Sequence, residues 1–198
     1  MSSFSQVFIN PFANLSDRMM LRIGLVAYVW ASLQVYLFRY VPDGVFQQHL
    51  TCEISWYAGF VNVAINILFP AALLWLMAKV LYNKVRWQDV LVVVMLAQVV
   101  NYVTGFLLMN PYSRSKSEHI LAAIESGDMM LKTVAPFDLF IIVSAGLVGL
   151  AMLIYFFYLL VVGMKIAMNS KKKVHAVWIV LVTLLADTLL HLWGPYLK

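Results

Sequence analysis

The sequence predicts an all-α membrane protein, a single domain over residues 1–198 that crosses the bilayer as a bundle of five helices. Five long apolar runs make up most of the chain. The chain is 63% hydrophobic and only 12% charged, whereas a soluble domain carries about 25% charged residues. Each run is long enough to cross the hydrocarbon, which takes about 20 apolar residues, and backbone in lipid must bond to itself, so each should be helical. The runs are residues 19–38, 54–82, 90–109, 137–168 and 174–193.

The basic residues indicate how the spans are oriented. With five crossings the loops alternate sides, and the 14 Lys and Arg residues divide into nine on the side of the N-terminus and five on the other. Positively charged loops stay in the cytoplasm, so we expect the N-terminus inside and the C-terminus outside. No basic stripe interleaves with aromatic residues, so nucleic acid is not an expected partner. The nine are Arg18, Arg22, Lys79, Lys84, Arg86, Lys165, Lys171, Lys172 and Lys173, and the five are Arg39, Arg114, Lys116, Lys132 and Lys198.

The first span is preceded by a short polar-aromatic lead. Its apolar residues recur at near-helical spacing around an Asn10-Pro11-Phe12 turn, which favours a short helix on the inner membrane surface. The loop after the span, residues 39–53, is expected on the outer side of the membrane and contains the turn signal Val41-Pro42-Asp43-Gly44. It also holds the single cysteine, Cys52, which can form no internal disulfide.

The second and third spans carry amides on one face each. Asn62, Asn66 and Pro70 lie four apart on the second span, where the proline predicts a bend. Gln98 and Asn101 lie on one stripe of the third span. A tight loop makes these spans antiparallel neighbours, so we expect the two stripes to face each other. Interhelical packing is the simpler interpretation, because an asparagine in lipid needs a partner on a neighbouring helix.

A long polar stretch, residues 110–136, separates the third span from the fourth and is expected outside. Within it, residues 117–130 predict an amphipathic helix that lies on the membrane surface or over the bundle. The fourth span is longer than a perpendicular crossing needs, so it should tilt or extend past the membrane. Asp138 begins it and is expected to cap the helix or complement its dipole.

The fifth span holds the ionisable pair that most needs an explanation. Asp187 and His191 lie four residues apart, so they share a helix face and can hydrogen-bond. A structural pair near the outer interface is the expected role, and a proton relay is the alternative. A metal site would need a further ligand, for which His49, His119 and Glu53 are loosely placed candidates. We expect no metal and no cofactor.

Catalytic patterns are missing from the sequence. It contains no G-x-S-x-G, no H-E-x-x-H, no Walker loop and no G-x-G-x-x-G. Five spans also do not divide into the two equal repeats of many transporters. We therefore predict no catalytic residues and no enzyme, with intramembrane chemistry at Asp187 and His191 as the one exception to test.

Three stretches of the chain, in this order, carry a family resemblance. They are the lead Phe8-Ile9-Asn10-Pro11-Phe12, residues 55–91 across the second span and its inner loop, and residues 136–150 at the start of the fourth span. Together they resemble the Ypt-interacting-protein (Yip-domain) family of five-span membrane proteins, in its bacterial branch. The resemblance implies an all-helical bundle with a cytosolic N-terminus and no known catalytic residues. The acidic D-L-Y-G-P run of the eukaryotic trafficking members is absent.

The predicted function is that of a non-enzymatic scaffold or organiser in the cytoplasmic (inner) membrane of a bacterium. Its expected partners are the lipid bilayer and other membrane proteins or further copies of itself. The alternative is a small-solute or proton carrier that uses a polar line through the bundle. The polar residues that could matter in either case are Asn62, Asn66, Gln98, Asn101, Asp187 and His191.

Overall fold

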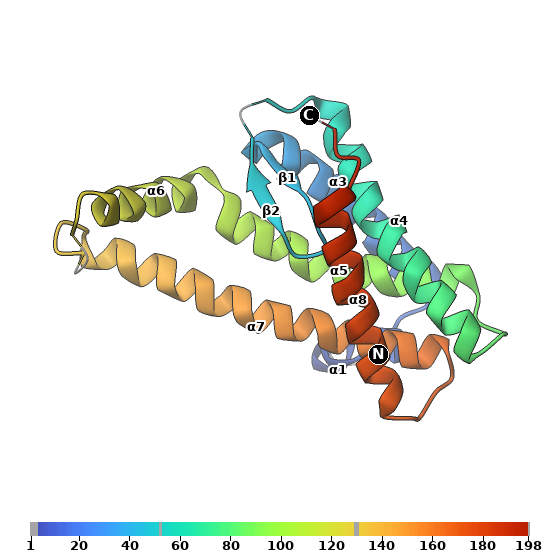
Figure 1. Cartoon of the computed structure of the whole chain (residues 1–198). Helices are drawn as coiled ribbons and strands as arrows, with labels where there is room; N and C mark the ends of the chain where they lie inside the picture. Colours follow the sequence, from blue (N-terminus) through green and yellow to red (C-terminus); the bar gives the residue numbers. More distant parts are fainter. Residues whose placement is uncertain (1–3, 52, 129–130, 198) are drawn as a thin grey trace.

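A computed structural model describes residues 4–51, 53–128 and 131–197 of the chain, and five long helices dominate it (Figure 1). All five are long and apolar enough to cross a membrane, as the sequence predicts. The first residues of the five helices differ most from the predicted ones at the third span, which begins at Trp87 rather than at residue 90. The five are α3 (Asp17–Phe38), α4 (Trp56–Leu81), α5 (Trp87–Met109), α7 (Pro136–Ala167) and α8 (Val174–Trp193).

Five short elements complete the fold. They are α1 (Phe4–Ile9), α2 (Pro11–Asn14), the strands β1 (Tyr40–Pro42) and β2 (Gln48–Leu50), and α6 (Pro111–Glu125). The sequence places an amphipathic helix at residues 117–130, but α6 begins earlier because Asn110 accepts from the backbone N–H of Ser113 and Pro111 fits the first helical turn. Cys52 and the end of that predicted segment, at residues 129–130, lie outside the described residues.

α3, α4 and α7 pack on α5, and α8 packs on α4 and α7. Among the long helices, α5 is the most buried and α7 the most exposed. Small residues allow the closest approaches. Gly59 of α4 lies against the carbonyl of Ser32 on α3, where a Cβ atom would overlap that oxygen. Ala27 and Ala31 on the same α3 helix are also buried. Close backbone approach of this kind is how helices associate in lipid.

The N-terminal helices dock on the C-terminal half of α7. The ring of Phe8 stacks on Tyr155 with centroids 4.6 Å apart, and the Tyr155 hydroxyl donates to the Phe8 carbonyl at 2.6 Å. Phe12 lies on Gly163, where a Cβ atom would come within 2.7 Å of both Phe12 and Val93. The predicted helix of the lead therefore forms in two pieces and is attached to the bundle.

α6 (residues 111–125) and the first half of α7 (residues 136–150) project together away from α3, α4 and α8, and we call them the α6–α7 arm (Figure 1). The Lys116 ammonium donates to Asp138 Oδ2 at 2.8 Å and ties the two helices together. Asp138 lies in the first turn of α7 as expected, but α7 has no side-chain capping bond at its N-terminus. Asp138 therefore lies where its charge complements the helix dipole, which is one of the two expected roles, while its side chain pairs with Lys116 and does not cap the helix.

The main departure from the sequence prediction is the segment between α3 and α4. Where the sequence predicts only a loop with a turn, the structure forms a β-hairpin with the register Tyr40↔Leu50, Val41↔His49 and Pro42↔Gln48. Its turn, residues 43–47, points back among the helices toward α5 and α8 (Figure 1). We call residues 43–47 the hairpin tip. Tyr40 and Val41 are only 2% and 1% exposed, so this segment belongs to the core.

Candidate functional site

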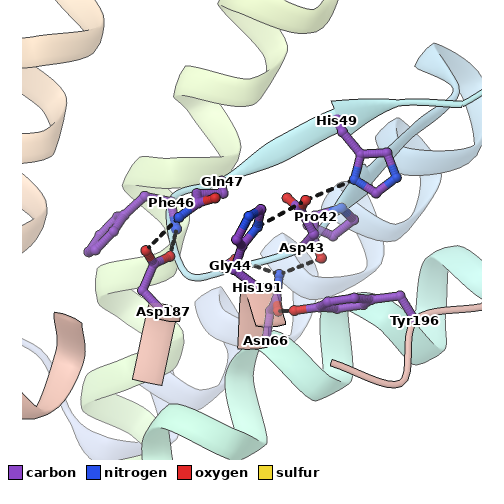
Figure 2. Close-up of polar contacts among 10 residues, drawn as sticks. All are labelled: Pro42, Asp43, Gly44, Phe46, Gln47, His49, Asn66, Asp187, His191 and Tyr196. Atoms are coloured by element: carbon purple, nitrogen blue, oxygen red, sulfur yellow. Dashed lines mark hydrogen bonds and ion pairs between the residues drawn. The ribbon is translucent and has the colours of Figure 1, made fainter. Parts of the chain in front are cut away.

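The hairpin tip brings polar backbone into a bundle that should be surrounded by lipid. Backbone groups there must find partners inside the protein, since no water is available in the hydrocarbon. The amide of Asn66 donates to the carbonyls of Pro42 at 3.1 Å and Gly44 at 2.9 Å (Figure 2). The amide of Asn101 donates to the Val45 carbonyl at 3.0 Å. Side chains of α4 and α5 thus replace water for this turn.

α8 binds the other side of the hairpin tip through Asp187. Its carboxylate accepts from the Phe46 backbone N–H at 3.0 Å and from the Gln47 side-chain amide at 3.1 Å (Figure 2). Two N–H donors therefore stabilise a carboxylate that is only 8% exposed. Gly44 lies close to this carboxylate: a Cβ atom there would come 2.5 Å from Asp187 Oδ1, so a larger residue would have to displace the Asp187 side chain.

α7 supports the tip with aromatic contacts. The ring of Phe46 meets Phe156 edge-on with centroids 5.1 Å apart and lies 5.2 Å from the ring of Phe157. Four helices, α4, α5, α7 and α8, therefore hold one five-residue turn.

Asp187 and His191 do not bond to each other, although they lie one turn apart on α8. His191 Nδ1 lies 3.3 Å from Asp43 Oδ2, and His49 Nδ1 lies 2.9 Å from the same oxygen (Figure 2). The expectation of a direct Asp187–His191 hydrogen bond is wrong, because each side chain turns to a partner on the hairpin instead. Both imidazoles are about half exposed, His49 at 49% and His191 at 47%.

The C-terminal tail is bound by the same face of α4. The Asn62 amide donates to the Leu197 carbonyl and accepts from the Leu197 backbone N–H, both at 2.9 Å. The Tyr196 hydroxyl donates to Asn66 Oδ1 at 2.7 Å (Figure 2). Burial raises the pKa of Tyr196, and the nearby Asp43 and Asp187 add to that effect, so the hydroxyl remains protonated and able to donate.

The amide stripes of α4 and α5 face each other, as the sequence predicts. Gln98 Nε2 donates to the Asn66 carbonyl at 3.3 Å. Asn101 Nδ2 donates to Gln98 Oε1 at 3.0 Å and to the hairpin as described. The partner that the sequence did not predict is the hairpin itself, which lies between the two stripes.

A small enclosed cavity lies where the hairpin meets α5. Its volume is about 20 Å³, enough for one water molecule. Two of the residues that line it, Tyr102 and Gln48, each have a buried side-chain oxygen without a hydrogen-bond partner among the described residues, Oη and Oε1 respectively. Of the candidate polar residues, Asn66, Gln98 and Asn101 line this cavity, while Asn62, Asp187 and His191 do not.

Several residues of the site were missed by the sequence analysis. Asp43, Gln47 and Gln48 lie in the segment assigned to an outside loop, and Tyr196 lies in the C-terminal tail. The turn signal Val41-Pro42-Asp43-Gly44 correctly marks a reversal of the chain, but it does not indicate how far the turn reaches into the helix bundle. The sequence did contain one indication of this segment. Six polar residues on the predicted spans need hydrogen-bond partners, which is consistent with a polar segment that enters the bundle.

The site shows no evident metal centre. The described ranges contain no group of three His, Cys, Asp or Glu side chains that could hold a metal ion. His49 does approach His191, through the shared carboxylate of Asp43. The arrangement can hold the hairpin and the tail in place.

Comparison with known proteins places the chain next to a known family. A family model described as the Yip1 domain matches residues 5–194, which is nearly the whole chain. No curated protein matches this sequence, and no solved structure matches this fold.

Proposed function

The chain belongs to the Yip1 domain family, and from this premise we propose that it is a non-enzymatic scaffold that holds partner proteins in the membrane. It is a multi-pass membrane protein with five apolar helices. Within the proposal, the compartment is the cytoplasmic membrane of a bacterium. The observation that carries the proposal is how the polar residues inside the bundle are used.

Those polar residues are engaged by the chain itself. Asn66, Asn101 and Asp187 bind the hairpin, and Asn62 binds the C-terminal tail. A catalytic or transport residue needs access to a substrate, whereas these groups are committed to backbone partners. This supports a structural role for them and leaves the outer surface of the bundle for function.

The surface best suited to bind a partner is the α6–α7 arm. The first half of α7 exposes large apolar side chains, among them Phe137 and Phe140 at 68% each and Leu147 at 64%. A Cβ atom at Gly146 would meet nothing within 4 Å, so another helix could approach closely there. An exposed apolar surface next to a glycine fits a membrane-embedded partner helix.

Site-specific photo-crosslinking in native membranes tests this proposal. A photoreactive residue at Phe140 or Leu147 should give protein adducts of defined mass. Matched controls are Val26 of α3 and Val177 of α8, which are 70% and 59% exposed and lie on other helices. These should yield adducts with lipid only.

A second experiment identifies the partner, and one set of crosslinking results would reject the proposal. Copies with two different tags distinguish self-association from binding of another protein, because only self-association links the two tags. Lipid adducts alone at all four positions, or the same protein adducts at all four, would argue against a scaffold that binds through the arm.

A carrier is the second candidate, and the small cavity favours it. Asn66, Gln98 and Asn101 converge on a space with the volume of one water molecule. Asn62 and Asp187 of the predicted polar line do not border it. Purified protein in proteoliposomes should increase proton or small-solute flux above that of empty liposomes if it is a carrier, and Asn101→Leu should abolish the increase.

A further inference from the structure

A groove lies at the end of the bundle that carries the N-terminal helices and the loop between α4 and α5. Its volume is about 570 Å³, within the usual range of ligand sites. Three parts of the chain form it: the α2–α3 segment, the first turns of α5 and the last turns of α7. None of the polar residues of the hairpin site contributes to it.

The inner surface of the groove is apolar and continues onto the outside of the bundle. Leu21 of α3 and Ile166 of α7 both line it, and they are 41% and 49% exposed. Leu91 and Val92 of α5 contribute further apolar surface. An occupant with hydrocarbon chains could therefore lie in the groove and extend from it into the bilayer.

The rim of the groove carries charges of both signs. Arg18 and Arg86 line it, and so do Asp17 and Asp89. All four side chains are exposed. In the part of the chain that the structure describes, none of the four forms an ion pair or a side-chain hydrogen bond. Two guanidinium groups and two carboxylates are therefore available to one ligand.

We propose that this groove binds a phospholipid with a zwitterionic, amine-bearing headgroup, of the phosphatidylethanolamine class. Arg18 and Arg86 bind the phosphate, since guanidinium groups match its oxygens in bidentate fashion. Asp17 and Asp89 accept hydrogen bonds from the primary ammonium. The acyl chains lie on the apolar surface beside Leu21 and Ile166.

The charge pattern selects this headgroup over the other common ones. A headgroup with net negative charge satisfies the arginines but meets two carboxylates that repel it. A choline headgroup has a quaternary ammonium, which has no N–H to donate to Asp17 or Asp89. A zwitterionic headgroup with a primary ammonium matches all four side chains. Its phosphate accepts hydrogen bonds from the two arginines, and its ammonium donates hydrogen bonds to the two aspartates.

Native mass spectrometry of the purified full chain tests the inference. The detergent-solubilised protein is mixed with equal amounts of phosphatidylethanolamine, phosphatidylglycerol and phosphatidylcholine of identical acyl chains. We expect one phosphatidylethanolamine to be retained at least fivefold more often than either competitor. The double variant Arg18→Gln/Arg86→Gln should lose that retention. Arg22→Gln, one turn further along α3 and not in the groove, should keep it.

The carboxylates provide a second variant with a different expected readout. Asp17→Asn/Asp89→Asn keeps the phosphate site but removes the partners of the ammonium. It should still bind one lipid while its preference shifts from phosphatidylethanolamine to phosphatidylglycerol. Equal retention of the three lipids by the unmodified chain, or unchanged retention after loss of both arginines, would overturn the proposal.

Discussion

The hydroxyl of Tyr196 donates to the side-chain oxygen of Asn66 at 2.7 Å, across 130 residues of sequence. The nitrogen of the same amide holds the hairpin carbonyls of Pro42 and Gly44. One asparagine on α4 therefore connects the two segments of the chain, hairpin and tail, that enter the end of the bundle without being helical.

Asn66→Leu should destabilise the fold strongly while keeping a similar volume. It leaves two hairpin carbonyls without a donor and the Tyr196 hydroxyl without an acceptor. A buried polar group left unpaired costs about 1–3 kcal/mol, and partial relaxation makes a total loss of about 2–4 kcal/mol reasonable. Equilibrium unfolding in mixed micelles measures it.

The matched control for that substitution is Thr188→Val on α8. Thr188 is exposed, and its hydroxyl bonds only to the Leu184 carbonyl of its own helix. The Thr188→Val substitution should change the free energy of unfolding of the protein by less than about 0.5 kcal/mol. Equal effects of the two substitutions would show that Asn66 does not support the hairpin.

Tyr102→Phe tests whether the small cavity holds water. Tyr102 Oη has no hydrogen-bond partner among the residues that the structure describes, so a bound water is the group that can satisfy it together with Gln48 Oε1. Removing the hydroxyl should then cost about 0.5–1.5 kcal/mol of stability, measured by unfolding. Tyr36→Phe, on the exposed surface of α3, is the control and should be neutral. A Tyr102→Phe variant more stable than the original chain would indicate a dry cavity.

Gly59→Ala should separate α3 from α4. The added methyl group would overlap the backbone oxygen of Ser32, which cannot move without shifting the helix, and overpacking of this kind costs about 1–3 kcal/mol. Gly146→Ala on α7 adds the same group where nothing lies within 4 Å. It should be neutral or gain up to about 1 kcal/mol from helix propensity. The difference in unfolding free energy between the two variants is the result, and its absence would contradict the packing of α3 on α4.

Tyr155→Phe should loosen the N-terminal helices without unfolding the bundle. It removes the hydrogen bond to the Phe8 carbonyl but keeps the stacked ring. A loss of about 0.5–1.5 kcal/mol corresponds to amide exchange in residues 4–14 that is roughly two- to twelvefold faster. Hydrogen–deuterium exchange measures it, with Tyr158→Phe as the control. Faster exchange throughout α7 would point to a general loss of structure instead.

The α6–α7 arm should open at alkaline pH. The hydrogen bond to Asp138 raises the pKa of Lys116 above its usual value of 10.5. Because the pKa of Lys116 is higher in the folded state, its contact with Asp138 contributes fully to stability below pH 10.5. That contribution is lost as the pH rises through the raised pKa of Lys116. Exchange in α6 should therefore accelerate above that range, and Lys116→Gln should show the faster exchange already at neutral pH. An identical pH profile for the variant and the original chain would contradict this role.

The long helices could be predicted from the sequence because their signal is local. Runs such as residues 174–193 are long and apolar enough to identify a span by themselves, and α8 occupies those same residues. The facing amides were also predictable, because a short loop makes α4 and α5 neighbours. The orientation of the termini rests on the distribution of basic residues and stays a prediction.

The hairpin could not be predicted, because its burial depends on contacts that are distant in sequence. Phe46 and Asp187 are 141 residues apart, and no local pattern joins them. The same limit explains the error at Asp187 and His191. Helical spacing places the two side chains on one face, but Asp43 and Gln47 decide which way each of them turns.

The way the hairpin is enclosed has a consequence for how the protein is made. The turn at residues 43–47 leaves the ribosome long before Asp187, which completes its hydrogen bonds. Until the last helix is inserted, the unpaired backbone of the turn has to stay in contact with water or with the insertion machinery. Chains that end before α8 should therefore keep this polar segment exposed, which would mark incomplete products for degradation.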